Sequence, residues 1–379
     1  MDFGLSDDQL ILQRSARDLL AKECPPAVVR RIAEGPSGHS EALDRRMAEM
    51  GWTGLLVPPA SGGLGLGMLD MAILLAEHGR AAVPGPFLFS ALLATRAIVR
   101  GADRRLKKQW LPKLASGECT ATIALLEESG DSAHPAVLRS RARRKGAAYV
   151  LSGRKLFVPY AHCVDLLITA CRTSGSDGPD GVTLFLVDRR ASGLSIRPLE
   201  TVDRTRRVCE VEMRRVEVPA DQLLGRLGGG WPVIEHLLDL AAVGVAADGF
   251  GGAERVLEMA VEYAKTRQQF GRLIGSFQAI KHIAAEMVAE IEPARSLVWF
   301  AAYAHDALPR EARRASSMAK AALSEIYSRC ANRAVQIHGG IGFTWEHDVH
   351  FWFKRAKWNE LAFGAPAFHR ERVAALGGF

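Results

Sequence analysis

The spacing of hydrophobic residues changes twice along the chain, and this order of patterns limits the folds it can adopt. Residues 1–118 carry apolar side chains with helical spacing, residues 119–222 carry short runs typical of β strands, and helical spacing returns in residues 223–379. The sequence therefore predicts an α+β protein with a helical domain, a small β barrel or sandwich, and a second helical domain. The expected strands are Thr122–Leu126, Ala148–Leu151, Leu166–Ala170, Val182–Val187, Leu194–Arg197 and Val208–Met213.

The composition is that of an ordinary globular protein. Of the 379 residues, 48% are hydrophobic and 24% are charged, which is enough to bury one large core or two to three smaller ones. The longest apolar runs, such as Leu240–Ala247, fall far short of the roughly 20 residues that span a bilayer. Residues Met1–Leu5 lack the basic and apolar regions of a signal peptide. We therefore expect a cytoplasmic protein that does not insert into membranes.

Cysteines and charges narrow the possible functions further. The six cysteines are scattered without a CxxC pair, which argues against a metal site or a disulfide framework and predicts reduced, buried thiols. The formal net charge is +7, but the basic residues form short clusters such as Arg104-Arg105 and Arg206-Arg207, interleaved with acids. A nucleic-acid surface usually presents a continuous basic stripe with stacking aromatics. This pattern argues against nucleic-acid binding.

A glycine-rich stretch, Pro58–Gly67, interrupts the first helical region. Such a stretch could cradle a phosphate, but it lacks the GK[ST] signature and no strong strand precedes it. We interpret it as a loop.

Two segments near the C-terminus combine glycines with possible phosphate ligands. Tyr263–Gly271 reads YAKTRQQFG, and Gln336–Phe343 reads QIHGGIGF. An apolar stripe over Val256–Tyr263 has the i, i+3, i+4, i+7 spacing of an amphipathic helix, and Arg267 would continue it one turn further. A guanidinium there suits a pyrophosphate. An arginine that offsets a helix dipole and glycines that end a helix explain the same residues.

Together with Phe277-Gln278 at the start of the next helix, these segments resemble the flavin-clasping helices of acyl-CoA dehydrogenases. The resemblance covers the whole chain and implies a C-terminal four-helix bundle, FAD as cofactor, acyl-CoA as substrate and an electron-transfer flavoprotein as acceptor. It also implies that the clasp reaches across a dimer interface to the pyrophosphate and adenine of a neighbour's FAD. The residues implied for this clasp are Arg267, Phe270, Gln278, Gln336, Gly339 and Gly340.

The family's α,β-desaturation needs a carboxylate that removes the α proton of the thioester while the flavin accepts the β hydride. Most members place a glutamate in a Tyr-Glu-Gly-Thr pattern, which corresponds here to Ala362–Ala365 with Phe363 at the glutamate position. Others place it on the first long C-terminal helix, where Ala241 stands. Neither residue accepts a proton. We expect Asp239 to face away from the site, because two residues turn a helix by about 200°, and Asp248 to lie about 10 Å further along.

The positions that hold the flavin ring in the family are also altered. Leu126 stands where members carry a threonine that hydrogen-bonds the ring, Pro159 replaces a second threonine, and Ala365 replaces a third. None of these side chains offers a donor. A flavin ring in this chain's own site would therefore lack partners.

The altered positions, such as Leu126, Pro159 and Phe363, would contact this chain's own flavin and substrate. The clasp residues, which fit the family pattern, would contact a neighbour's FAD. This asymmetry resembles the non-catalytic subunit of heteromeric α2β2 acyl-CoA dehydrogenases, a bacterial type associated with steroid side-chain degradation. We therefore expect a partner subunit of an acyl-CoA dehydrogenase, assembled as a dimer of dimers. A self-sufficient homotetramer with a relocated base, a flavin monooxygenase on the same fold, and a flavin-free binding subunit remain open.

Overall fold

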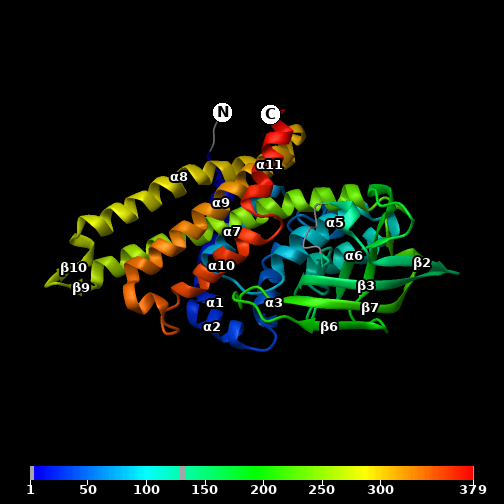
Figure 1. The fold of residues 1–379 in the computed structure, drawn as a ribbon, viewed down its shortest axis with the longest axis horizontal. Coiled ribbons are helices and arrows are strands. Elements are labelled where there is room, and N and C mark those ends of the chain that lie inside the picture. The colour runs from blue at the N-terminus through cyan, green and yellow to red at the C-terminus, as the bar shows by residue number, and fades with distance from the viewer. Residues whose placement is uncertain (1–3, 129–133, 379) are drawn as a thin grey trace.

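The computed structural model describes residues 4–128 and 134–378. Helices from both ends of the sequence pack together, and the sheet occupies one end of the molecule (Figure 1). The N-terminal helices are α1 (Asp7–Glu23), α2 (Pro26–Glu34), α3 (Glu41–Glu49), α4 (Met68–Arg80), the π-helical segment η3 (Leu88–Ala94), α5 (Thr95–Gly101) and α6 (Arg104–Ser116).

Hydrogen bonds at the helix starts fix the N-terminal helices in place. The Ser6 hydroxyl accepts from the Gln9 amide, and the Gln9 side chain accepts from the Ser6 amide, which forms a capping box for α1. The first amides of α4, at Met68 and Leu69, donate to Asp306 of the C-terminal domain at 2.9 and 3.2 Å. A residue from the far end of the chain thus caps α4 and aligns it with the C-terminal helices.

The glycine-rich stretch is a loop, as the sequence predicts. Only a short 3-10 turn, η2 (Pro59–Ser61), interrupts it before α4 begins. A Cβ atom on Gly63 would lie 2.1 Å from the carbonyl oxygen of Val57, so close backbone packing explains that glycine.

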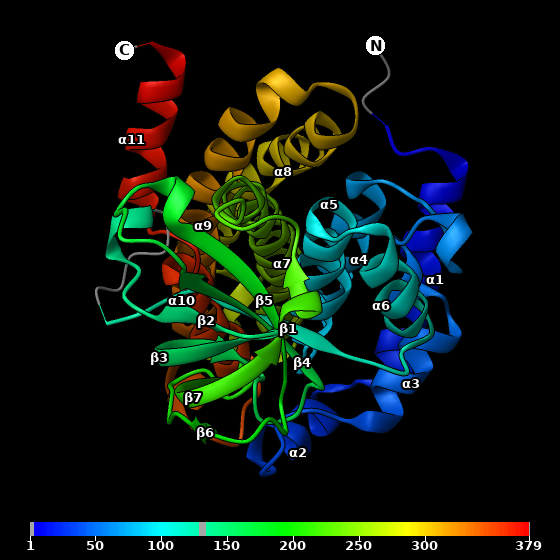
Figure 2. The same cartoon turned by 90° about the vertical axis from the view of Figure 1, so that its right-hand side faces the viewer.

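One mixed sheet of eight strands forms the middle domain. The strand order is β6-β7-β3-β2-β4-β5-β8, with β1 paired in parallel to β4. All six expected strands are present, and β3 and β7 are longer than expected. The N-terminal helices flank the sheet on one side (Figure 2). The strands are β1 (Ala121–Ala124), β2 (Arg141–Lys145), β3 (Ala148–Pro159), β4 (Leu166–Arg172), β5 (Val182–Asp188), β6 (Leu194–Pro198), β7 (Val208–Pro219) and β8 (Leu223–Leu224).

The C-terminal domain is built around α9, which packs against the other four helices of the domain. Its long helices extend away from the sheet to a short hairpin of β9 and β10 (Figure 1). The elements are α7 (Trp231–Thr266), β9 (Gln268–Gln269), β10 (Arg272–Leu273), α8 (Gln278–Ala307), α9 (Pro309–His338), the 3-10 segment η8 (Gly339–Phe343), α10 (Val349–Leu361) and α11 (Pro366–Gly377).

Two further observations bear on the sequence-based expectations. No helix in the described part of the chain is long and apolar enough to cross a bilayer. All six cysteines are free thiols; five are buried and Cys163 is partly buried. The expectation of reduced, buried thiols is therefore confirmed for five of them.

A buried ionic network joins the domains. Asp248 of α7 accepts hydrogen bonds from Arg355 of α10 at 2.5 and 2.9 Å, from Arg206 of the middle domain at 2.7 Å and from Asn359 at 2.9 Å. Both arginines and Asp248 are almost completely buried. Although burial opposes ionisation, the two guanidinium groups lower the pKa of Asp248 to about 2. Asp248 is thus a structural residue that stays charged at neutral pH.

Candidate functional site

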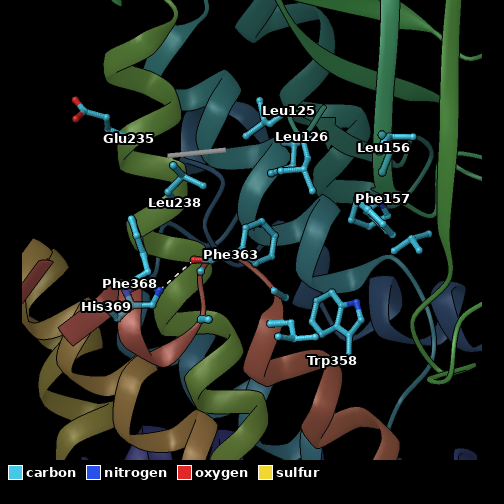
Figure 3. A pocket seen from close by; sticks show the side chains of 18 of the residues that line it. Leu125, Leu126, Leu156, Phe157, Glu235, Leu238, Trp358, Phe363, Phe368 and His369 are labelled. Carbon is cyan, nitrogen blue, oxygen red and sulfur yellow. Dashed lines mark hydrogen bonds between the residues drawn. The ribbon is translucent and has the colours of Figure 1, made fainter. Parts of the chain in front are cut away.

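A pocket of about 680 Å³ lies between the sheet and the C-terminal helices (Figure 3). Its walls come from the end of β1, from β3, from the first turns of α7 and from the turn between α10 and α11. Most of these side chains are apolar. The lining residues are Ile123, Leu125, Leu126, Leu156, Phe157, Val158, Pro159, Thr201, Val208, Glu235, Leu238, Arg313, Trp358, Leu361, Ala362, Phe363, Gly364, Ala365, Phe368, His369 and Arg372.

The structure brings four of the altered positions together in this pocket. Leu126 and Pro159 approach from the β domain, while Phe363 and Ala365 lie on the turn after α10. Segments more than 200 residues apart in sequence therefore meet at one cavity. The side chains at these positions offer neither a hydrogen-bond donor nor a proton acceptor.

The turn that carries Phe363 has an uncommon backbone. Phe363 has a φ of +58° and Gly364 a φ of +107°, both in the left-handed region. The Phe363 carbonyl accepts a hydrogen bond from Nε2 of His369 at 3.0 Å (Figure 3), and the Gly364 carbonyl accepts one from Nζ of Lys320 at 3.0 Å. These two hydrogen bonds, one donated from α11 and one from α9, hold the strained turn in place.

Lys320 and His369 are buried beneath the turn. Lys320 also donates to the Ser324 hydroxyl at 2.9 Å and to the Glu360 carbonyl at 3.2 Å, and burial lowers its pKa to about 7. Burial likewise lowers the pKa of His369 to about 4, so the imidazole is neutral. Because Nε2 donates, Nδ1 accepts, and its partner at 3.2 Å is the Ser317 hydroxyl.

One expectation for α7 needs correction. Ala241 is fully buried and does not line the pocket, whereas Leu238, one helical turn earlier, does. Asp239 is not among the lining residues, but it lies next to two of them: Arg372 donates to it at 2.5 Å and Arg313 lies 3.6 Å from it. Asp239 follows Leu238 by about 100° of helix rotation, which places it at the edge of the pocket-facing stripe.

Sequence reasoning missed the polar rim of this pocket. Glu235 is the only carboxylate among the lining residues, and it accepts from Arg313 at 3.2 Å. Burial raises the pKa of Asp239, although Arg372 and Arg313 oppose that shift. Glu235 and Leu238 lie at i and i+3 on α7, so their shared face was visible in the sequence, but their partners on α9 and α11 were not.

The residues expected to clasp a neighbour's FAD lie at the other end of the molecule, around the β9–β10 hairpin (Figure 1). The two segments meet through Tyr263 and His338, whose rings stack with centroids 4.7 Å apart. Arg267 does not continue the apolar stripe. The helix ends at Thr266, and Arg267 is extended and exposed, with no side-chain partner among the described residues.

The remaining clasp positions are also open to solvent. Phe270 is 92% exposed at the hairpin tip, and Gln278 and Gln336 are exposed as well. A Cβ atom on Gly339 or Gly340 would meet nothing within 4 Å, so the packing of this chain gives Gly340 no steric reason to be glycine. Such freedom suits the close approach of another molecule.

Next to this clasp lies a second pocket of about 500 Å³, which includes Gln336, Phe343 and Trp345 in its lining. The ammonium group of Lys354 lies 3.7 Å from the Trp345 ring centroid. Among the described residues, no group of three histidine, cysteine or acidic side chains could hold a metal ion.

The larger pocket does not fit a flavin ring. The ring's nitrogen and oxygen atoms need hydrogen-bond partners, and Leu126, Pro159 and Ala365 supply no side-chain donor. The exposed Arg267 and Gln336 at the other end fit a phosphate and a nucleotide. The large pocket and the clasp residues thus differ in the part of a flavin nucleotide that they could hold.

A helical, β and helical domain order, with a pocket between the sheet and the helical bundle, is the architecture of a class of flavin-dependent oxidoreductases. Models of the acyl-CoA dehydrogenase N-terminal, middle and C-terminal domains match residues 6–118, 122–216 and 228–377. An acyl-CoA dehydrogenase of Bacillus subtilis is 31% identical over 99% of this chain and 99% of its own length. The chain belongs to the acyl-CoA dehydrogenase family, whose members are FAD-dependent oxidoreductases that act on acyl-CoA.

Two solved structures are similar over the whole chain. A glutaryl-CoA dehydrogenase in complex with glutaryl-CoA has a TM-score of 0.92 and 29% identity, covering 100% of this chain and 97% of that one. A chain of the ChsE4–ChsE5 complex from Mycobacterium tuberculosis has a TM-score of 0.90 and 28% identity, covering 100% and 99%. The predicted family and fold are therefore confirmed.

Proposed function

We propose that this chain is the partner subunit of a heteromeric acyl-CoA dehydrogenase, assembled as an α2β2 dimer of dimers. It lacks the catalytic glutamate, and it completes the FAD site of a neighbouring subunit that supplies the base. The observation that carries this proposal is the contrast between the large pocket and the clasp residues at the opposite end of the molecule. The pocket presents Phe363 and three positions without donors, whereas the clasp presents exposed and unpaired polar residues.

Hydrogen-bond energetics support the first half of the proposal. Each buried polar atom without a partner costs about 1–3 kcal/mol. A flavin ring in this pocket would leave several such atoms unpaired, since the polar side chains of the lining bond to protein groups. The total would offset much of the binding free energy of a flavin nucleotide.

The clasp supports the second half. Arg267 presents a charged fork of donors that no described residue occupies, and a pyrophosphate is its natural bidentate ligand. Phe270 exposes an aromatic ring that an interface would bury. The similarity to a chain of the ChsE4–ChsE5 complex is consistent with a heteromeric assembly. An electron-transfer flavoprotein would then be the electron acceptor of the assembled enzyme.

Flavin stoichiometry tests the proposal. The chain expressed alone should be colourless, and co-expression with an adjacent dehydrogenase gene should give a yellow complex with about one FAD per two chains. A ratio near one FAD per chain contradicts the partner-subunit role.

A self-sufficient enzyme with a relocated base is the second candidate, and one observation favours it. Glu235 is a carboxylate on the pocket rim. If the chain alone desaturates acyl-CoA, Glu235→Gln should abolish turnover while leaving the fold intact. Activity that survives this substitution excludes Glu235 as the base.

A further inference from the structure

The second pocket, of about 500 Å³, has polar and charged side chains that the packing of this chain leaves unused. It is formed by α9, η8 and α10, and its volume lies within the roughly 300–1,000 Å³ that small-molecule sites occupy. His350 and Lys354 line it, and their i, i+4 spacing places them on one face of α10. Neither side chain has a hydrogen-bond partner in the part of the chain that the structure describes.

His350 is a buried ring with two unpaired nitrogens. It is 7% exposed, and neither Nδ1 nor Nε2 has a partner of hydrogen-bonding geometry among the described residues, although the Trp345 backbone weakly favours its protonation. Burial and the nearby Lys354 lower the pKa of His350 to about 4, so the ring is neutral and has one donor and one acceptor. A ligand in this pocket can satisfy polar atoms that no protein group satisfies.

Lys354 is a cation without a counter-charge. Its ammonium group lies 3.7 Å from the centroid of the Trp345 ring, and no described carboxylate forms an ion pair with it. Burial and the exposed Arg204 lower the pKa of Lys354, and a bound anion would oppose both effects. The other cation of the lining, Arg333, already pairs with Glu290 at 2.7 Å. Lys354 is therefore the group in this lining that is ready to meet an anion.

One unpaired cation beside a neutral imidazole suits a monoanion. A carboxylate has two oxygens, so it can accept from Nζ of Lys354 and from the N–H of His350 at the same time. A phosphate dianion would keep part of its charge unpaired here, because the arginine fork that suits it best is occupied on Arg333. These residues thus favour a carboxylate over a phosphate.

The remaining walls of the pocket are largely aromatic. Phe343 is 80% exposed, Trp345 is 53% exposed and Phe353 is 38% exposed, and all three line the pocket. Aromatic surface gains free energy when an apolar group displaces water from it. The lining as a whole therefore combines a site for one negative charge with a surface for an apolar group.

We propose that this pocket binds a small carboxylic acid with an apolar or aromatic body. Lys354 and His350 hold the carboxylate, and the three exposed aromatic side chains cover the body. The ligand binds without any bond being made or broken in it. The inference goes beyond the partner-subunit role, because it gives Lys354 and His350 a ligand that is not part of the flavin nucleotide.

Three probes test the chemistry of the site by calorimetric titration of the purified full-length chain. 3-Phenylpropionate carries the carboxylate, 3-phenylpropanamide has the same body without the charge, and adenosine monophosphate represents a nucleotide. We expect the acid to bind at least fivefold tighter than the amide, and this preference to shrink at about 0.5 M salt, because salt screens charge pairs. Equal affinities of acid and amide, or tighter binding of the nucleotide, overturn the proposal.

Variants place the acid in this pocket. Lys354→Met keeps the stem of the side chain and removes its charge, so the acid should bind at least fivefold more weakly while the amide binds as before. His350→Phe keeps a ring and removes both nitrogens, which should weaken the acid about threefold. Lys281→Met, at an exposed position of α8 outside the lining, is the control and should change neither affinity. Binding that survives Lys354→Met but is lost in Arg372→Met would place the acid in the larger pocket and overturn the proposal.

A surface variant covers the case in which Lys354→Met does not fold. Phe343→Asp changes an 80% exposed side chain, so it leaves the core intact and places a negative charge beside the bound carboxylate. The acid should bind at least fivefold more weakly to this variant, because like charges repel. Unchanged affinity for the acid would overturn the proposal.

The co-expressed complex separates a small-molecule ligand from a group that a neighbouring subunit supplies. The complex should bind 3-phenylpropionate as the isolated chain does. Exclusion of the acid from the complex would show that the neighbour fills the pocket, and it would overturn the proposal of a small-molecule ligand. These results are independent of flavin stoichiometry, since one FAD per chain contradicts only the partner-subunit role.

Discussion

Nε2 of His369 donates a hydrogen bond to the carbonyl oxygen of Phe363 at 3.0 Å, and it thereby fixes the turn that carries this side chain. Nζ of Lys320, on α9, donates a hydrogen bond to the next carbonyl, that of Gly364. The side chain at position 363 therefore points into the pocket as a consequence of the backbone. In the function that we propose, Phe363 stands where a catalytic carboxylate is expected and offers no proton acceptor, while backbone hydrogen bonds hold the turn.

The isolated chain should show little or no acyl-CoA-dependent reduction of an electron acceptor. A well-placed general base contributes about 10²–10⁴-fold to rate, and neither Phe363 nor Ala241 accepts a proton. Phe363→Glu and Ala241→Glu should not restore turnover, because Leu126, Pro159 and Ala365 still leave a flavin ring without side-chain donors. Ferrocenium reduction with short, long and steroid-like acyl-CoAs is the measurement. Robust turnover by the wild-type chain alone would contradict this prediction.

Arg267→Lys should weaken retention of FAD in the co-expressed complex by roughly 1–3 kcal/mol, since an ammonium group cannot make the bidentate contact of a guanidinium. Folding should be unaffected, because Arg267 is exposed and has no partner in this chain. Arg141→Lys, at an exposed position on β2, is the control. Flavin content after dialysis decides the matter, and equal FAD retention in both variants would show that Arg267 is a solvated residue.

The sequence predicts most of the fold because the spacing of hydrophobic residues differs between helices and strands. It misses β2, where Arg141–Lys145 has only Ala142 buried, since this strand is held by its pairing with β3 and not by its own apolar pattern. It also misplaces Arg267, because apolar spacing does not reveal that the helix ends at Thr266.

The candidate site is predictable only in part, because its contacts join residues that are far apart in the sequence. Phe363, Leu126 and Pro159 are found by comparing local patterns with a family. The contacts that surround them are not local: Lys320 reaches Gly364 across 44 residues, and Arg372 reaches Asp239 across 133. Such pairs form through tertiary packing, for which the sequence carries no periodic signal.

Lys320→Met should change how stability depends on pH. Burial lowers the pKa of Lys320 from 10.5 to about 7, so between these values the unfolded chain binds the proton that the folded chain has released. Stability of the wild type should therefore rise with pH relative to the variant, by on the order of 2 kcal/mol between pH 7 and 9. Denaturant unfolding measures the difference, with the exposed Lys108→Met as control. A difference that does not vary with pH would contradict the shifted pKa.

Asp248→Asn should destabilise the folded chain by about 3–5 kcal/mol, because it leaves Arg206 and Arg355 buried without a counter-charge. The folded pKa of Asp248 is lowered from 3.8 to about 2, so its contribution is fully present above about pH 4 and is lost as pH falls through 2. The stability gap between wild type and variant should accordingly shrink by about 2 kcal/mol over that interval. Urea unfolding at pH 7, 4 and 2 tests both statements, with Asp18→Asn on the exposed face of α1 as the matched control. A gap below 1 kcal/mol at pH 7 would show that the network of Arg206, Asp248 and Arg355 does not depend on the Asp248 charge.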